Sequence, residues 1–285
     1  MLSNLKVIPA VLHETAQEWL RNKPNLIGAA LAFYIIFSLG PMLIVTVWFT
    51  GMIFGQNVAE IQISHEISAL VGKKPAAVLE TFLSEAVSAP TLAISPFISI
   101  PLIFLGAAMI FFQLQDALHF IWEITPKKRR KIIRLIINYL YSLTMILVVG
   151  FLLIVLIAKS SALAVAKVYI LNYFPSYVFM VNIFDLFITY VVITLLFAMI
   201  YQILPRTTIH ISDVWAGAAV TTILFAAGQY LIELYLSTTN IDSAYGAIGS
   251  FIILFIWIFY SCQIFLFGAV FTKVYIRRVS RKTLL

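Results

Sequence analysis

Charge and cysteine are scarce in this sequence. Only 11% of its 285 residues are charged and 62% are hydrophobic, whereas charged residues make up about 25% of an ordinary soluble domain. This composition excludes a water-soluble globular protein. The single cysteine, Cys262, excludes an internal disulfide, so cysteine usage does not reveal the redox compartment.

Sequence motifs of catalysis are also missing. The chain has no Walker A loop, no dinucleotide fingerprint, no HExxH motif and no cysteine and histidine spacing suited to a metal. We therefore expect no enzyme activity, no catalytic or metal-binding residue and no cofactor. A membrane-embedded enzyme remains an alternative, because catalytic partners need to meet only in space.

What the sequence does have is a series of long apolar stretches. Each exceeds the ~20 residues that an α-helix needs to cross ~30 Å of hydrocarbon. Helices are the expected form, because lipid offers the backbone no hydrogen bonds. The six expected spans are residues 29–54, 92–114, 135–158, 178–204, 214–236 and 247–271. The sequence thus predicts an all-α, polytopic membrane helix bundle that forms one integral membrane domain over residues 1–285.

Lysine and arginine lie mostly on one side of these spans. Fifteen of the 19 fall in the N-terminal tail, the loops after the second and fourth spans, and the C-terminal end. Because positive charge accumulates on the cytoplasmic side, we expect both termini there. The basic loop 127–134 is expected to contact anionic lipid headgroups, so membrane lipids are the expected partners. Nucleic acid is not expected, since the run lacks interleaved aromatic residues.

Two segments outside the spans have amphipathic patterns. Residues 1–24 are expected to form an interfacial cytoplasmic helix. Its apolar face comprises Ile8, Leu12, Thr15 and Trp19. Residues 55–91 are expected to form two short helices on the extracytoplasmic side, separated at residues 72–75. This second segment is either a lid that only packs or a functional gate.

Prolines mark the spans that we expect to be distorted. Pro41 follows Gly40 in the middle of the first span, and Pro96 and Pro101 lie in the second. Proline removes a backbone donor and clashes with the preceding turn, so kinks are expected at these points. Broken helices often line transport sites. The alternative is that the kinks only shape the packing.

Polar residues within the apolar stretches are the best candidates for a functional site. A charge in hydrocarbon is unfavourable and usually faces a cavity or a partner. Asp185 in the fourth span shares a helix face with Asn182 and Thr189. Lys159 and Lys167, near the outer end of the third span, are available partners. The alternative is an interfacial acid that pairs with these lysines and reaches the headgroups.

Further polar candidates extend this site toward both membrane surfaces. Gln229 and Glu233 in the fifth span and Asp242 in the outer loop are expected on the extracytoplasmic half. Gln113 and Asp116 are expected at the cytoplasmic mouth. The sequence predicts that spans 1, 2, 4, 5 and 6 surround one polar cavity lined by these residues.

Four stretches of the chain form a recognisable set of motifs. They are GAALAFY at 28–34 with FSLGP at 37–41, AL at 117–118 with IW at 121–122, LP at 204–205 with Trp215 and Gly217, and YGAIGS at 245–250 with Trp257, Tyr260 and Gly268. In this order and spacing they resemble the YihY/BrkB family of bacterial inner-membrane proteins. Two positions depart from the family pattern. Val270 stands where the family usually has an acid, and His119 stands where it often has asparagine.

The resemblance implies an inner-membrane protein with six spans and both termini in the cytoplasm. It also implies transport of lipid-like or small polar molecules. The ribonuclease BN label that some family members have carried finds no support in these residues. A non-catalytic scaffold or envelope assembly factor is the alternative, and a homo-oligomer is left open.

The same motif residues are suited to packing helices closely. Gly28 with Ala32, and Gly246 with Ser250, are pairs of small residues four apart, which allow helix backbones to approach. Gly217 and Gly249 likewise have no side chain that would keep a neighbouring helix away. Aromatic residues accompany them. Tyr34 and Tyr245 could hydrogen-bond inside the bundle or line the cavity.

Overall fold

The computed structural model describes residues 8–55, 63–64, 68, 72–88, 96–124, 131–173, 178–205, 211–239 and 247–280. Every element within these residues is helical, which confirms the all-α class. The helices are α1 (Ile8–Arg21), α2 (Pro24–Phe54), α4 (Lys73–Ser88), α5 (Pro96–Ile121), α6 (Lys131–Tyr173), α7 (Val178–Ile203), α8 (Ile211–Thr238) and α10 (Ala247–Tyr275). A π-helical turn, η3 (Ile276–Ser280), follows α10.

Five helices are long and apolar enough to cross a membrane. Their apolar stretches are Pro24–Val47, Tyr139–Lys167, Phe179–Ile203, Val214–Leu236 and Phe251–Arg278. The remaining expected span falls on α5, a 26-residue helix with the single carboxylate Asp116. The total of six spans therefore stays a prediction.

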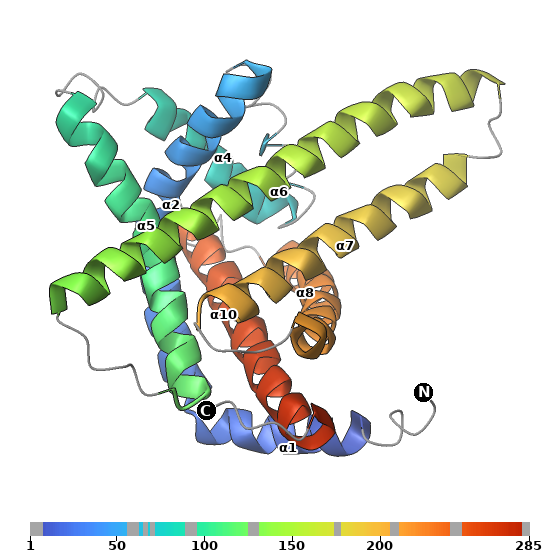
Figure 1. Cartoon of the computed structure of the whole chain (residues 1–285). Helices are drawn as coiled ribbons and strands as arrows, with labels where there is room; N and C mark the ends of the chain where they lie inside the picture. Colours follow the sequence, from blue (N-terminus) through green and yellow to red (C-terminus); the bar gives the residue numbers. More distant parts are fainter. Residues whose placement is uncertain are drawn as a thin grey trace.

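Helix α6 is much longer than the sequence predicted. The expected span ended at residue 158, but α6 continues to Tyr173 and has 43 residues. At 1.5 Å per residue it is roughly 65 Å long, about twice the hydrocarbon thickness. Its outer part runs beside the start of α7, and this pair of helix ends lies away from α2 and α5 (Figure 1).

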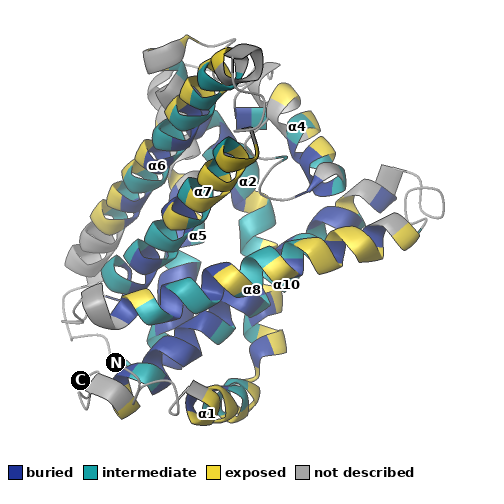
Figure 2. Ribbon diagram, turned by 90° about the vertical axis from the view of Figure 1, so that its right-hand side faces the viewer, coloured by how far each residue is buried: buried dark blue, intermediate teal, exposed yellow. Residues whose placement is uncertain are grey.

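The large helices form a closed series of contacts. Helix α5 packs on α2, α2 on α10, α10 on α8, α8 on α7 and α7 on α6, and α6 returns to contact α5 and α2. The helices cross steeply rather than running parallel, since α8 is seen end-on in Figure 1 and lengthwise in Figure 2. Helix α10 is central, because it also contacts α1, α4 and α5. Its C-terminal half is almost entirely buried (Figure 2).

Glycines allow α8 and α10 to touch. A Cβ atom added to Gly217 of α8 would overlap the side chain of Thr272, and one added to Gly268 of α10 would overlap Thr221. Gly28 of α2 lies equally close to Gln263 of α10. Gly28 and Gly217 thus lie where helices come close together, as the predicted packing role requires. Ala32 and Gly249 are also buried, whereas Gly246 lies outside the described residues.

The prolines of α2 and α5 do not end their helices. Pro96 is the first residue of α5, a position whose N–H group would make no hydrogen bond within the helix. Pro41 and Pro101 lie inside continuous helices. Pro41 also forms part of the α2–α5 contact. A Cβ atom on Gly106 of α5 would lie only 2.6 Å from the Pro41 Cγ atom. Pro41 thus contributes directly to packing.

Helix α1 packs on α10 with a face that differs from the predicted one. Val11 and Thr15 are fully buried, but Leu12, which the pattern placed on the apolar face, is exposed. Thr15 can be buried because its hydroxyl donates to the Val11 carbonyl at 2.7 Å. Trp19 meets Phe267 edge to face, with 6.1 Å between ring centroids. The face is set by docking on protein, which the hydrophobic pattern alone does not indicate.

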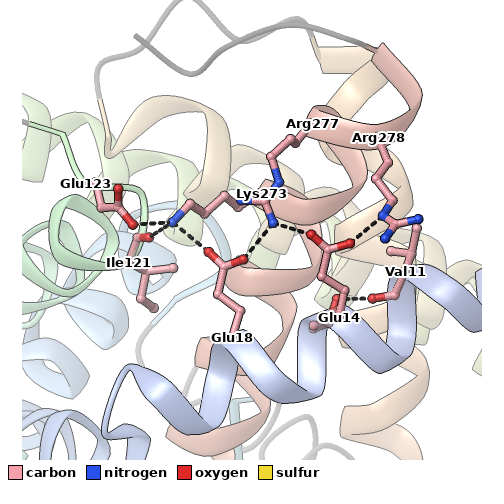
Figure 3. A network of polar contacts seen from close by, with 9 residues as sticks. Val11, Glu14, Glu18, Ile121, Glu123, Lys273, Arg277 and Arg278 are labelled. Atoms are coloured by element: carbon pink, nitrogen blue, oxygen red, sulfur yellow. Dashed lines mark hydrogen bonds and ion pairs between the residues drawn. The ribbon is translucent and has the colours of Figure 1, made fainter.

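Charged residues complete this contact. Glu18 pairs with Lys273 at 2.7 Å, and Arg277 bonds both Glu18, at 2.8 Å, and Glu14. Arg278 also bonds Glu14. Figure 3 shows these side chains between α1 and the end of α10. We call this group, Glu14, Glu18, Lys273, Arg277 and Arg278, the terminal clasp.

Helix α4 belongs to the bundle instead of lying loosely over it. Its residues Ala76 and Leu79 join the main buried cluster, and the helix contacts α2, α8 and α10. The Lys74 ammonium donates to the Leu236 carbonyl at the end of α8, at 2.7 Å. Of the first short helix predicted within 55–91, only Ile63, Ser64 and Ser68 are described, and Ile63 is buried.

Candidate functional site

The charged side chains inside the apolar stretches of α6 and α7 meet at one point. Asp185 of α7 is 2.7 Å from the Lys159 ammonium through Oδ1 and 3.8 Å from the Lys167 ammonium through Oδ2. Both lysines come from α6. The structure therefore confirms the predicted partners of Asp185, and these three residues form the charged cluster discussed below.

Thr189 holds the inner side of the charged cluster. Its hydroxyl donates to the backbone carbonyl of Asp185, one turn earlier, at 2.9 Å. The same oxygen accepts a hydrogen bond from the Lys159 ammonium at 2.6 Å. A hydroxyl can do both, because it has one hydrogen and two lone pairs. Lys159 is thus fixed by the carboxylate and the hydroxyl together, and its side chain is only 9% exposed.

Apolar side chains surround the charged cluster and face outward. Asp185 is about 10 Å from the first residue of α7, at 1.5 Å per residue. The exposed residues on this part of α7 are Phe179, Met180, Ile183, Phe184, Leu186 and Phe187. Exposed apolar side chains on a membrane helix are suited to lipid contact. The part of α7 that carries Asp185 therefore exposes an apolar surface suited to lipid contact.

The charged cluster carries an excess of positive charge. Two ammonium groups face one carboxylate, so the net charge is about +1 when all three are ionised. Charged groups removed from water need partners with good geometry. Lys159 has a hydrogen bond to Thr189 and a 2.7 Å ion pair with Asp185, whose Oδ1 atom is buried without a well-aligned hydrogen bond. Within the described part of the chain, Lys167 has the longer ion pair alone and is 33% exposed.

The other outer candidates are dispersed. Asn182 is exposed on α7, and Gln229 is half-buried on α8. Glu233 is exposed, and its carboxylate lies close to Gly72 at the start of α4. A helix N-terminus stabilises a nearby negative charge. Asp242 and Tyr245 lie outside the described residues. The partners found for Asp185 are on α6, a span that the predicted cavity did not include.

The inner candidates are not buried together. Asp116 is exposed, and Gln113 and Tyr34 are half-buried. The neighbouring Gln115 is instead the buried polar residue of α5, and its side-chain amide donates to the Leu204 carbonyl at 2.8 Å. His119 Nε2 lies 3.2 Å from the Pro205 carbonyl. The end of α5 thus satisfies the free carbonyls at the end of α7.

A polar network that the sequence analysis missed joins α5, α7, α8 and α10. The hydroxyl of Tyr201, fully buried on α7, donates to the Phe265 carbonyl at 2.8 Å and lies 3.1 Å from the Thr221 hydroxyl. Trp122 Nε1 donates to the Ala269 carbonyl at 2.8 Å. Trp122 and Gly268 both belong to the recognised motifs. Those motifs therefore meet in a packing network around Tyr201.

Lys273 also has a role that the sequence did not suggest. It was counted only as a topology charge, yet it is 8% exposed. Its ammonium donates to the Ile121 carbonyl at 2.9 Å and pairs with Glu123 at 2.8 Å as well as with Glu18. It therefore connects the end of α5 to α1 and α10 (Figure 3). Among the described residues, no group of three or more acids, histidines or cysteines could hold a metal ion.

Comparison with known proteins places most of the chain in one family. The family model described as "Virulence factor BrkB" matches residues 15–284. A UPF0761 membrane protein of Actinobacillus pleuropneumoniae is 34% identical over 85 residues, which are 30% of this chain and 31% of that protein. A UPF0761 membrane protein of Klebsiella pneumoniae is 36% identical over 77 residues, 27% of each chain. One of Psychromonas ingrahamii is 38% identical over 78 residues, 26% of each.

These alignments cover less than a third of the curated relatives' own length. No solved structure matches the chain.

Proposed function

The chain belongs to the BrkB family of membrane proteins, and we propose that it moves lipid-like or small polar molecules across the bacterial inner membrane. The observation that supports this proposal is the charged cluster of Lys159, Asp185 and Lys167. In this proposal the polar part of the transported molecule meets the cluster, while its apolar part lies along the exposed face of α7.

The charges of this cluster are energetically unfavourable within a membrane. Placing one ionised lysine or aspartate at the centre of a membrane helix costs about 2.5–3.5 kcal/mol on insertion scales, and less toward the surface. A buried ion pair replaced by apolar side chains often leaves stability unchanged or raised. The cluster is thus not needed to hold α6 against α7, which already pack through Leu152, Leu156 and Val192. A role in binding accounts for its presence.

Transport by this protein is tested with a labelled lipid in vesicles. Full-length protein is reconstituted into phosphatidylethanolamine and phosphatidylglycerol vesicles that contain NBD-phosphatidylglycerol, and dithionite then measures transbilayer movement. We expect Asp185→Asn and Lys159→Met to reduce movement toward the rate of protein-free vesicles. Arg21→Gln, which removes an exposed charge at the end of α1, is the matched control.

A charge-reversed pair separates binding from simple packing. The double variant Lys159→Asp with Asp185→Lys restores an ion pair between α6 and α7 but relocates both charges. If the transport proposal holds, this double variant folds but moves lipid more slowly than the wild-type protein does. Full activity in the folded single and double variants would show that transport does not depend on the cluster.

A scaffold is the second candidate function. It is favoured by the close packing of α8 and α10 through Gly217 and Gly268, and by the terminal clasp. A scaffold would tolerate Asp185→Asn and Lys159→Met in cells as well as in vesicles. Loss of cellular function only on substitution at an exposed surface, with transport unaffected, would support this alternative.

A further inference from the structure

Lys167 differs from Lys159 although both face the same carboxylate. Lys159 is 2.7 Å from Asp185, is bonded to Thr189 and is 9% exposed. Lys167 is 3.8 Å from the other carboxylate oxygen and is 33% exposed. An N–O separation of that length is too long for a direct hydrogen bond. Lys167 thus has donor capacity that Asp185 does not use.

The helix segments that carry the charged cluster also expose apolar side chains. On α6, Val165 is 60% exposed and Tyr169 is 65% exposed, and each is two residues from Lys167, on another face of the helix. On α7, Phe184 and Phe187 are also exposed. Side chains suited to acyl chains therefore occur on the same stretches of α6 and α7 as the excess positive charge. The membrane supplies one anion with apolar chains attached, the phosphate-bearing headgroup of an anionic lipid.

We propose that Lys167, supported by Lys159, binds the phosphate group of an anionic lipid at the outer end of the α6–α7 pair. The proposal deepens the transport function and rests on it for the view that lipid meets the protein here. The phosphate occupies the free donors of Lys167, and the acyl chains lie along Phe184 and Phe187. Asp185 repels the phosphate and so limits how tightly the lipid is held.

Lysine and aspartate have opposite effects on phosphate binding, and this difference separates lipid binding from a structural role. Removing Lys167 removes an attraction to the phosphate, whereas removing the charge of Asp185 removes a repulsion. A residue with a purely structural role would weaken binding when substituted, whichever its charge. Lys167→Gln is suited to this test because the lysine side chain is partly exposed and, among the described residues, makes just the 3.8 Å ion pair.

The experiment is native mass spectrometry of the full chain in detergent, titrated with phosphatidylglycerol, phosphatidylcholine or inorganic phosphate. We expect phosphatidylglycerol to bind more tightly than phosphatidylcholine. We expect Lys167→Gln to weaken phosphatidylglycerol binding about fivefold, in keeping with the usual contribution of one lysine near an anionic surface. Asp185→Asn should tighten binding, and Arg21→Gln should leave it unchanged.

Two outcomes overturn the proposal. One is equal binding of phosphatidylglycerol and phosphatidylcholine, or binding that neither Lys167→Gln nor Asp185→Asn alters. The other is competition by inorganic phosphate at the same concentration as the lipid, which would identify a free anion as the ligand.

The transport proposal fails separately. If Asp185→Asn tightens lipid binding while lipid movement in vesicles stays at the wild-type rate, the binding site stands and the transport function does not. If movement is lost but binding shows no preference for the anionic lipid, the transport function stands and the phosphate site does not.

Discussion

The hydroxyl-bearing side chain of Thr272 on α10 fills the space where a Cβ atom on Gly217 of α8 would be. The same relation holds in reverse, with Thr221 of α8 against Gly268 of α10. Each threonine hydroxyl also donates to a backbone carbonyl one turn earlier, that of Gly268 and Gly217 respectively. The two helices therefore touch at backbone distance, with the threonine donors satisfied.

The first prediction concerns these glycines. Gly217→Ala and Gly268→Ala place a methyl group inside the facing threonine, so each should lower the free energy of unfolding by about 1–3 kcal/mol, the usual effect of overpacking. Thermal unfolding in detergent, followed by circular dichroism, measures the change. Gly40→Ala is the matched control, because nothing lies within 4 Å of a Cβ atom there. Equal stability of all three variants would contradict the close contact.

The second prediction concerns the buried network around Tyr201. Tyr201→Phe leaves the Phe265 carbonyl without the donor that lies 2.8 Å away, and Trp122→Phe does the same to the Ala269 carbonyl. We expect each to destabilise the protein by about 0.5–1.5 kcal/mol, the net value of such a hydrogen bond. Tyr230→Phe, on an exposed tyrosine of α8, serves as control. Chemical denaturation with the same probe compares them, and an unchanged midpoint for Tyr201→Phe would refute the role assigned to its hydroxyl.

The third prediction concerns the pH dependence of the terminal clasp. Burial acts to raise the pKa of the Glu18 carboxyl, but the bonds to Lys273 and Arg277 outweigh it and hold the pKa below its ordinary value of 4.5. Burial likewise acts to raise the pKa of Glu14, and its bonds to Arg278 and Arg277 again make the net shift downward. A carboxyl whose pKa is lowered on folding contributes stability above its ordinary pKa, and this stability is lost as the pH falls.

The double variant Glu14→Gln with Glu18→Gln tests this sign. Wild type should be more stable than the variant at pH 7, and the difference should shrink below about pH 4.5 as the wild-type carboxyls take up protons. Melting temperatures of both proteins between pH 3.5 and pH 7 measure this. Asp116→Asn, at an exposed carboxylate, should show no such trend. A difference that grows in acid would mean that the clasp does not stabilise the fold.

The fourth prediction concerns topology. The charge distribution places α1 on the cytoplasmic side and α4 on the opposite side, and the structure places these helices at opposite ends of the molecule (Figure 1). In a chain with Cys262→Ser, an impermeant maleimide added to intact cells should label Thr81→Cys and spare His13→Cys. Both positions are exposed. The reverse labelling pattern would show that the topology is opposite to the predicted one.

The fifth prediction concerns nuclease activity. We propose that the chain has none, as its sequence motifs suggest. Purified protein in detergent should leave RNA intact in the presence of Mg²⁺ or Zn²⁺. Cleavage that a point substitution in this chain abolishes would disprove the proposal, whereas cleavage removed by further purification would not.

The sequence predicted much of the fold because apolar length is a direct measure of membrane crossing. The helices around Pro24–Val47 and Phe179–Ile203 followed from this measure alone. The extension of α6 to Tyr173 did not, because alanine, lysine and tyrosine after residue 158 lower the hydropathy without interrupting the helix. Nothing in a hydropathy pattern separates a helix end from a helix that leaves the membrane.

The candidate site was predicted in part. Asp185 with Lys159 and Lys167 followed from charge in an apolar setting. The burial of Gln115 in place of Asp116 did not, since the two are adjacent and only the position of α7 decides which faces inward. Leu12 and Val11 on α1 differ for the same reason. Helical periodicity predicts the buried face of a helix to within about one residue. The position of the neighbouring helix then decides which residues are buried.

The terminal clasp joins the first described helix to the last. During synthesis Glu14 and Glu18 leave the ribosome long before Lys273, Arg277 and Arg278, which are the residues that bind them. Until α10 has been inserted, α1 has no docking surface on it and its acidic side chains have no such partners. Closure of the clasp therefore requires α10 to be in place, and a chain interrupted before α10 lacks the residues that bind Glu14 and Glu18.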